Sequence, residues 1–380
     1  MTIRKILATL LALSMTLSLA ACGGSSTQTG TTQSEQTEQA EEASSVPDES
    51  ESDESAPDET TAENTETETP ADETEASEPA EKVDINLAAL SGPTALGMLD
   101  LLEKNDNGEA ANNYNVTIAT APDEVTGKII SGELDIAAVP TNVASTLYNK
   151  TEGQVQIAAL NTMGVLYILE TGDTIQSVAD LAGKTIYATG QGSTPEYALN
   201  LVLEKNGLTP GEDVEIVFAA DNAEIAPLLA SGEAQVALLP QPFVTSVLTQ
   251  NENVRVALDL TEEWDKAVNG ESGLTMGCVV VRKEFAEQNK EALDRFLDEY
   301  KQSVETVTSE EGLAHAAELA EHYNIIKAAV AEKAIPECNI VFVEGDEMQQ
   351  IAGGFLQVLY DANPQAVGGQ LPNDDFYYKR

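Results

Sequence analysis

The chain has 380 residues and carries 65 acidic against 19 basic side chains, a formal net charge of −46. A surface this acidic repels phosphate backbones, so the composition excludes a nucleic-acid-binding protein. One Trp, two His and three Cys also exclude a scaffold built on disulfides and a zinc module of the Cys/His type. The length fits one large domain or two domains of ordinary size.

The first 21 residues are predicted to be a signal peptide. Arg4 and Lys5 precede an uncharged apolar stretch over 6–19, which is too short to span a bilayer comfortably. Small residues then lead directly to Cys22, a pattern that resembles the lipobox of bacterial lipoproteins. The resemblance implies cleavage before Cys22 and lipidation of its thiol, which would anchor the chain at the extracytoplasmic face of the cell membrane. The alternative is an ordinary signal peptide with an incidental cysteine.

Residues 22–82 are predicted to be a lipidated cysteine followed by a disordered acidic tether. Between 24 and 82 the sequence has no Leu, Ile, Phe, Tyr or Trp. Such a segment cannot bury enough apolar surface to offset the entropy of ordering it. It would hold a folded body near the membrane while leaving the body free to turn, and a solubilising tail is a compatible interpretation.

From Val83 onward, short apolar runs alternate with segments of helical length. This alternation is typical of parallel sheets joined by crossover helices. In chain order, strands are predicted over 85–90, 116–119, 136–139, 156–160, 165–170, 184–188, 214–218, 235–239 and 254–258. Helices are predicted over 93–104, 122–131, 141–148, 195–206, 223–231 and 243–249, and after Val281 over 284–307, 310–323, 325–332 and 346–361.

An internal repeat indicates two similar lobes. Residues 131–140, SGELDIAAVP, are matched by residues 231–240, SGEAQVALLP. Each run ends a predicted helix at a glycine and continues as a buried strand that stops at a proline. The spacing is too long for a solenoid, so it favours two α/β halves instead.

Four small polar loops follow predicted strands and open helices. Ligands of open parallel sheets bind beyond the carboxyl ends of the strands, and the free N–H groups of a helix N-terminus attract an anion or a carbonyl oxygen. Ordinary helix capping explains any one loop better, but the shared position of all four at strand ends favours a ligand site. The candidate ligand-binding residues are Ser91, Gly92, Pro93, Thr94, Thr141, Asn142, Gly192, Ser193, Thr194, Gln241 and Phe243.

A resemblance to a known family lies in the repeat and in residues 181–187 (LAGKTIY), 190–197 (GQGSTPEY) and 239–243 (LPQPF). In these segments the chain resembles the substrate-binding lipoproteins of ABC importers, in the group of nitrate, sulfonate, taurine and thiamine-pyrimidine receptors. The resemblance implies an α/β, two-lobed type II periplasmic-binding-protein fold. Each lobe would be a mostly parallel sheet flanked by helices, with two crossover strands as the hinge. Lobe 1 would comprise 83–168 plus 277–380, and lobe 2 would comprise 169–276.

Two glycines lie close to the expected crossings between the lobes. Gly164 precedes the first crossing and Gly277 lies in the second. They could absorb the change of backbone dihedrals when the lobes close, or they could only allow two backbones to pack closely.

The resemblance implies a monomeric receptor that captures a small-molecule solute and passes it to an ABC permease and its ATPase. The candidate loops contain no Arg, Lys, Asp or His. The expected solute is therefore a small neutral, zwitterionic or monoanionic organic molecule or an oxyanion, such as a sulfonate, nitrate or a pyrimidine-like compound. Relatives often have Glu where Gln241 stands, and a neutral amide weakens the case for an amino-pyrimidine.

No catalytic residue, metal site or cofactor is predicted. The sequence has no G-x-S-x-G motif, and both histidines lie in the helical C-terminal part. The alternatives are a surface adhesin or structural lipoprotein and an enzyme similar to a pyrimidine synthase of a related fold. The inward polar loops argue against the first, and a missing cysteine-rich motif argues against the second. Whether Cys278 and Cys338 form a disulfide stays open.

Overall fold

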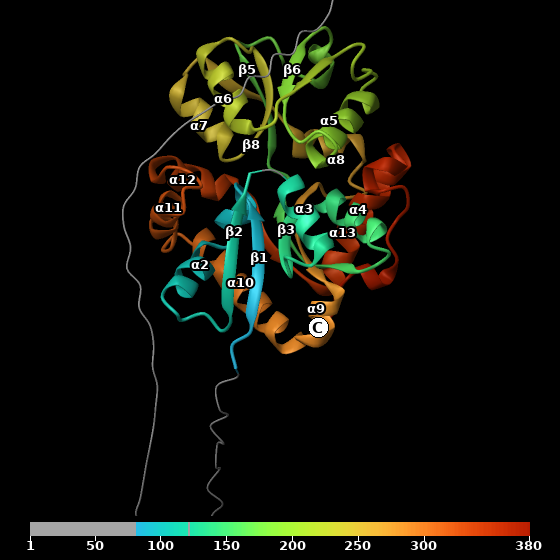
Figure 1. Ribbon diagram of the computed structural model, residues 1–380. Helices are drawn as coiled ribbons and strands as arrows, with labels where there is room; N and C mark the ends of the chain where they lie inside the picture. The colour runs from blue at the N-terminus through green and yellow to red at the C-terminus, as the bar shows by residue number, and fades with distance from the viewer. Residues whose placement is uncertain (1–80, 121) are drawn as a thin grey trace, which may run out of the picture. The chain divides into compact units, whose positions relative to one another are not determined.

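The computed structural model describes residues 81–120 and 122–380. The predicted signal peptide, Cys22 and nearly all of the predicted tether lie outside the described residues. Strands and helices alternate along the described chain, and the strands form two separate sheets (Figure 1). No helix in these described ranges is long and apolar enough to cross a membrane.

The first sheet has six strands in the order β11-β4-β10-β3-β1-β2. They are β1 (Asp84–Leu90), β2 (Asn113–Ala119), β3 (Ile136–Pro140), β4 (Val155–Met163), β10 (Thr275–Arg282) and β11 (Ile340–Val343). The helices that accompany it are α1 (Pro93–Leu96), α2 (Leu99–Asp106), α3 (Pro122–Ser131), α4 (Thr141–Lys150), α9 (Lys283–Gln288), α10 (Lys290–Thr308), α11 (Leu313–His322), α12 (Ala328–Ala334) and α13 (Gly345–Ala362).

The second sheet has five strands in the order β7-β6-β8-β5-β9. They are β5 (Leu166–Thr171), β6 (Thr185–Ala188), β7 (Glu215–Phe218), β8 (Val236–Pro240) and β9 (Val254–Asp259). Its helices are α5 (Thr194–Lys205), α6 (Asn222–Ser231), α7 (Phe243–Gln250) and α8 (Leu260–Ala267). Short 3₁₀ turns complete the described chain at Val178–Leu181, Ile335–Glu337, Pro364–Val367 and Asp374–Phe376.

The two-sheet α/β architecture confirms the predicted fold class, but the sheets are mixed. β1 pairs in parallel with β2 and β3, and β6 pairs in parallel with β7 and β8. β10 runs antiparallel to β3 and β4, and β5 runs antiparallel to β8 and β9. The expectation of mostly parallel sheets is therefore wrong where β5 and β10 enter, because each strand comes from the other sheet and runs antiparallel to its neighbours. The lobe boundaries stay a prediction; the strands change sheet between Met163 and Leu166 and again between Asp259 and Thr275.

The repeated sequence occupies equivalent places in the two sheets. Gly132 and Gly232 follow α3 and α6 with φ of 80° and 81°, the left-handed conformation that glycine adopts at a helix end without steric cost. β3 and β8 follow, and each lies between one parallel and one antiparallel neighbour. The two halves of the repeat are thus built alike.

Two helices differ from the prediction. The helix expected over 93–104 is divided at Gly97, where a Cβ would lie 3.0 Å from Ile340 Cγ2 and 3.3 Å from Tyr300 Oη. Where α8 lies, the sequence led us to expect only a helix turn anchored by Trp264, although it carries a helix-start signal. Asp259 accepts hydrogen bonds from the backbone of Thr261 and Glu262, as an N-cap residue does.

The two later cysteines are not joined. Cys278 and Cys338 are both buried and both free. Burial raises the pKa of both thiols well above the ordinary value. A buried thiol with a raised pKa is inert as a nucleophile, so both cysteines act as core residues.

The two crossing glycines favour close packing over a hinge role. A Cβ at Gly164 would lie 2.1 Å from Thr261 Oγ1, and a Cβ at Gly277 would lie 2.5 Å from Asn161 Oδ1. Neither glycine has a left-handed φ. The space around the backbone, and not the backbone angle, therefore requires glycine at both positions.

We predict that Gly164→Ala lowers the free energy of unfolding by roughly 1–3 kcal/mol, because the new methyl group overpacks the contact with α8. Adding Thr261→Ala to the same chain should recover part of this loss. The matched control is Gly127→Ala, at an exposed site in α3 with open space around it, which should raise stability by about 1 kcal/mol. Urea unfolding measures all three; equal effects for Gly164→Ala and Gly127→Ala would contradict the packing argument.

Candidate functional site

A cavity of about 310 Å³ lies where loops of both sheets meet, and we call it the Phe243 cavity. The loops after β1 and β2, with Pro140 at the end of β3, line it from the first sheet. The loops after β6 and β7 and the start of α7 line it from the second. Its lining residues are Leu90, Ser91, Thr120, Pro140, Thr189, Gly190, Ser193, Pro195, Ala220, Asp221, Asn222, Ala223, Phe243, Met276 and Ile325. The volume lies at the lower end of the range for small-molecule sites.

Parallel strands bring these loops together. β1, β2 and β3 all run in one direction, so their carboxyl ends meet at one edge of the first sheet. The same holds for β6, β7 and β8 in the second sheet. β10 is antiparallel to β3, so its start lies at that edge and supplies Met276. A site at such an edge is the expected place for a ligand in an α/β sheet.

The polar groups of the Phe243 cavity are mostly oxygen acceptors and hydroxyls. The Thr189 hydroxyl donates to Asn222 Oδ1 at 2.8 Å, which leaves the Asn222 amide group to donate elsewhere. Asp221 caps α6 by accepting from the Ala223 N–H at 2.8 Å. The Ser193 hydroxyl donates to the Gly190 carbonyl at 2.7 Å.

Apolar side chains form the other walls of the Phe243 cavity. Leu90, Phe243, Met276 and Ile325 contribute them, each partly buried. Ile325 comes from the turn between α11 and α12, far along the chain from the other lining residues. Such walls suit a compact organic body with a few polar groups.

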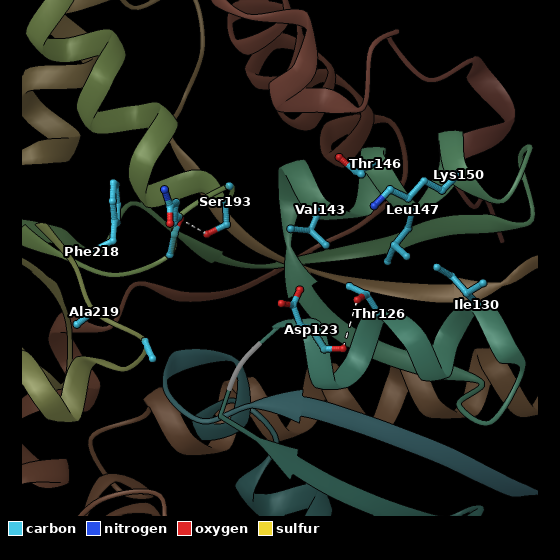
Figure 2. Close-up of a pocket in the computed structure, with 14 residues that line it drawn as sticks. Asp123, Thr126, Ile130, Val143, Thr146, Leu147, Lys150, Ser193, Phe218 and Ala219 are labelled. Atoms are coloured by element: carbon cyan, nitrogen blue, oxygen red, sulfur yellow. Dashed lines mark hydrogen bonds between the residues drawn. The ribbon is translucent and has the colours of Figure 1, made fainter. Parts of the chain in front are cut away.

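A second cavity, of about 570 Å³, shares Gly190, Ser193 and Ala220 with the first and is named here the Lys150 cavity. Figure 2 shows Asp123 and Lys150 among its labelled side chains, with Phe218 across from them. It is larger, but its lining takes only the loop over 190–193 from the predicted loops. The Phe243 cavity receives residues from three of those loops besides Pro140, so it is the better candidate for a built site.

Three predicted residues line the Phe243 cavity: Ser91, Ser193 and Phe243. Gly192 lines only the Lys150 cavity. The structure thus brings one loop residue of the first sheet together with one loop and one helix residue of the second.

Asn142 and Thr194 contact each other directly. The Thr194 hydroxyl donates to Asn142 Oδ1 at 3.1 Å. Asn142 Nδ2 donates to the Ala366 carbonyl at 3.0 Å and to the Gly192 carbonyl at 3.4 Å. Both side chains are at most 1% exposed, so they join the starts of α4 and α5 and line neither cavity.

The remaining predicted residues also lie outside the linings of the two cavities. The Thr94 hydroxyl donates to the Leu90 carbonyl at 2.7 Å, beside Gly92 and Pro93 at the start of α1. Thr141 is completely buried. Gln241 Oε1 accepts from the backbone N–H and the hydroxyl of Thr245 at 3.1 and 2.8 Å, so it caps α7. Of these residues, Gln241 matches the capping interpretation of single loops.

Sequence reasoning missed the loops after β2 and β7, which supply Thr120 and the segment 220–223. The signal was present, because both loops also join a predicted strand to a predicted helix. The ends of β2 and β7 therefore follow the same rule. Ile325 carried no such signal, since only the packing of α11 and α12 brings it to the cavity.

Comparison with known proteins identifies the class of protein. Residues 105–332, more than half of the chain, match the family of ABC transporter, phosphonate, periplasmic substrate-binding proteins. The chain belongs to this family, whose members are the substrate-binding components of ABC importers. Its family places it among periplasmic or extracytoplasmic binding proteins that serve a permease partner. Curated proteins give no match.

Solved structures share the fold. An ABC transporter structure from Parabacteroides distasonis is 24% identical with a TM-score of 0.64, covering 78% of this chain and 99% of that one. The periplasmic aliphatic sulphonate-binding protein of Escherichia coli is 15% identical with a TM-score of 0.62, covering 78% and 92%. The alkanesulfonate-binding protein of Xanthomonas axonopodis pv. citri, bound to MOPS, is 17% identical with a TM-score of 0.59, covering 77% and 96%. They confirm the type II periplasmic-binding-protein fold.

Proposed function

We propose that the chain captures its solute in the Phe243 cavity and releases it, unchanged, to an ABC permease. The observation that carries this proposal is the composition of the lining, which draws on three strand ends of one sheet and on loops and a helix start of the other. A solute held there would contact both sets of loops at once. Binding would therefore favour the arrangement in which these loops are close together.

Among the predicted residues, we propose that Ser91, Ser193 and Phe243 contact the solute. The others would act by holding the loops in shape: Gly92, Pro93, Thr94, Thr141, Asn142, Gly192, Thr194 and Gln241. The bonds between Asn142 and the start of α5 support such a role, because they link loops that the solute would also bridge.

We also propose that Cys22 carries a lipid and that the chain acts as a monomer at the extracytoplasmic face of the membrane. The lipobox pattern before Cys22 supports the anchor. Mass spectrometry of the membrane-extracted protein tests it: a diacylglycerol mass on Cys22 is expected, and an unmodified cysteine would contradict it.

Capture without turnover is supported by the chemistry of the Phe243 cavity. Its lining offers hydroxyls, an amide, one carboxylate and apolar walls, and none of these described residues is a histidine, cysteine or lysine. The nearest cysteine in the sheet, Cys278, has a buried thiol whose pKa burial raises. We therefore expect a bound solute to be recovered chemically unchanged after incubation, as chromatography with mass detection will show.

We predict that Phe243→Ala weakens solute binding roughly 10- to 100-fold, because an aromatic wall contributes about 1–3 kcal/mol of contact. A thermal-shift screen of the purified full chain over sulfonates, phosphonates, nitrate, pyrimidines, amino acids and amines supplies the solute, and calorimetry measures its affinity. Ile130→Ala is the matched control, because Ile130 is 53% exposed and lines only the Lys150 cavity. Loss of binding in Ile130→Ala alone would place the solute in the Lys150 cavity instead.

A further inference from the structure

The Phe243 cavity has an unbalanced charge. Asp221 is the one titratable side chain among its described lining residues, which include no Lys, Arg or His. Asp123 and Lys150 line only the adjoining Lys150 cavity. A solute in the Phe243 cavity therefore meets a carboxylate and no cationic side chain in its lining.

Asp221 caps α6 with one carboxylate oxygen and can still accept a hydrogen bond with the other. Its Oδ1 accepts from the Ala223 N–H, and Oδ2 makes no hydrogen bond or ion pair within 81–120 and 122–380. A carboxylate has about four lone-pair sites on its two oxygens, so a second donor can be accommodated. The side chain is partly buried, and a charge interaction there is screened less than one on the open surface.

The groups around Asp221 also favour a donor. The hydroxyl of Thr120 donates to Glu124 Oε1 at 2.8 Å, so its oxygen is left to accept a hydrogen bond from the solute. At the loop shared with the Lys150 cavity, the Glu196 carboxylate accepts from the Gly192 N–H. Carboxylates thus recur around the loops, and a bound oxyanion would experience repulsion that no lining cation offsets.

We propose that the solute carries a protonated amine that pairs with Asp221, on a compact body that packs against Phe243, Met276 and Ile325. This inference rests on the proposed function, because it assumes that the Phe243 cavity holds the solute. It narrows the range of solutes expected from the loop sequences. Oxyanions that lack an amine are excluded, and amine-bearing zwitterions and organic amines remain. The family description and the sulfonate-binding neighbours alone do not lead to this narrowing.

Matched pairs of probes, with and without an amine, isolate the contribution of the amine to binding. The pairs are 2-aminoethanesulfonate with ethanesulfonate, 2-aminoethylphosphonate with ethylphosphonate, and benzylamine with benzyl alcohol. Calorimetry on the purified full chain is expected to show, in at least one pair, an amine that binds at least about tenfold more tightly than its partner, since a hydrogen bond to a charged group is worth that much. Equal or tighter binding of the amine-free member in every pair would overturn the inference.

The variant Asp221→Asn tests whether the charge of Asp221 pairs with the amine. Asparagine caps helices as well as aspartate does, so the fold should be preserved while the charge is lost. Binding of the amine should weaken roughly 10- to 100-fold. The control Glu224→Gln removes the same charge from an exposed position in the first turn of α6 and should change affinity by less than about threefold.

The outcomes separate the two proposals. If amine-free anions bind, and Phe243→Ala abolishes their binding while Asp221→Asn strengthens it, the proposed site stands and the amine inference fails. If binding of every probe is insensitive to Phe243→Ala, the proposed site fails, and the inference fails with it. Loss of amine binding in Asp221→Asn, together with retention in Glu224→Gln, supports both.

Discussion

Replacement of Trp264 by alanine is expected to lower the free energy of unfolding by about 3–5 kcal/mol. The indole is fully buried, and its Nε1 donates to the Ser272 carbonyl at 2.9 Å. It packs against Phe355 of α13 with 5.5 Å between ring centroids. Trp264 lies on α8, between the last strand of the second sheet and the return to the first. Alanine would leave a large cavity and would remove the hydrogen-bond donor to the partly buried carbonyl of Ser272.

The variant Trp264→Phe separates packing from hydrogen bonding. It keeps an aromatic ring but loses the indole N–H, so a loss of about 1–2 kcal/mol is expected. Urea unfolding followed by circular dichroism is the appropriate measurement, because the chain has one tryptophan and its fluorescence disappears with the mutation. A loss below about 1 kcal/mol for Trp264→Ala would show that this core relaxes around the cavity.

Glu170→Gln is expected to lower the free energy of unfolding by about 3 kcal/mol at neutral pH, because it removes the charge of a buried carboxylate that pairs with a partly exposed arginine. Only 2% of the Glu170 side chain is exposed, and it pairs with Arg255 from the neighbouring strand β9. Its carboxylate also accepts from the backbone N–H groups of Thr174 and Ile175. An amide has one acceptor oxygen and would turn its NH₂ group toward some of these donors.

The same pair predicts the direction of a pH dependence. Burial alone would raise the pKa of Glu170, but hydrogen bonds from Ile175, Arg255 and Thr174 outweigh it and hold the pKa below the ordinary value of 4.5. A carboxyl group with a lowered pKa in the folded state stabilises the fold above its ordinary pKa. That contribution is lost as the pH falls from about 4.5 through the lower folded pKa.

Unfolding measured from pH 7 down to pH 3 checks this expectation. The stability difference between the natural chain and Glu170→Gln should shrink as the pH falls below about 4.5. Glu233→Gln, at an exposed site, is the control and should change stability by no more than about 0.5 kcal/mol at any pH. A constant difference across the range would show that the charge of Glu170 contributes nothing.

The candidate site was only partly accessible from the sequence. The rule that ligands meet the carboxyl ends of parallel strands led to Ser91, Ser193 and Phe243, because strand ends can be read from short apolar runs. The rule cannot say where each side chain points. Asn142 and Thr194 carry ideal binding groups, yet they bond to each other and are buried.

The sequence by itself determined the alternation of strands and helices after Val83 and the repeated runs over 131–140 and 231–240, because these depend on local composition and periodicity. The export signal before Cys22 stays a prediction. Tertiary structure decided the rest. The antiparallel entry of β5 and β10 depends on contacts between distant segments. The meeting of Asp221 and Ile325 in one cavity depends on how whole elements pack. A local sequence pattern does not specify which distant segments come into contact. Only the folded chain therefore shows which polar groups remain available to a solute.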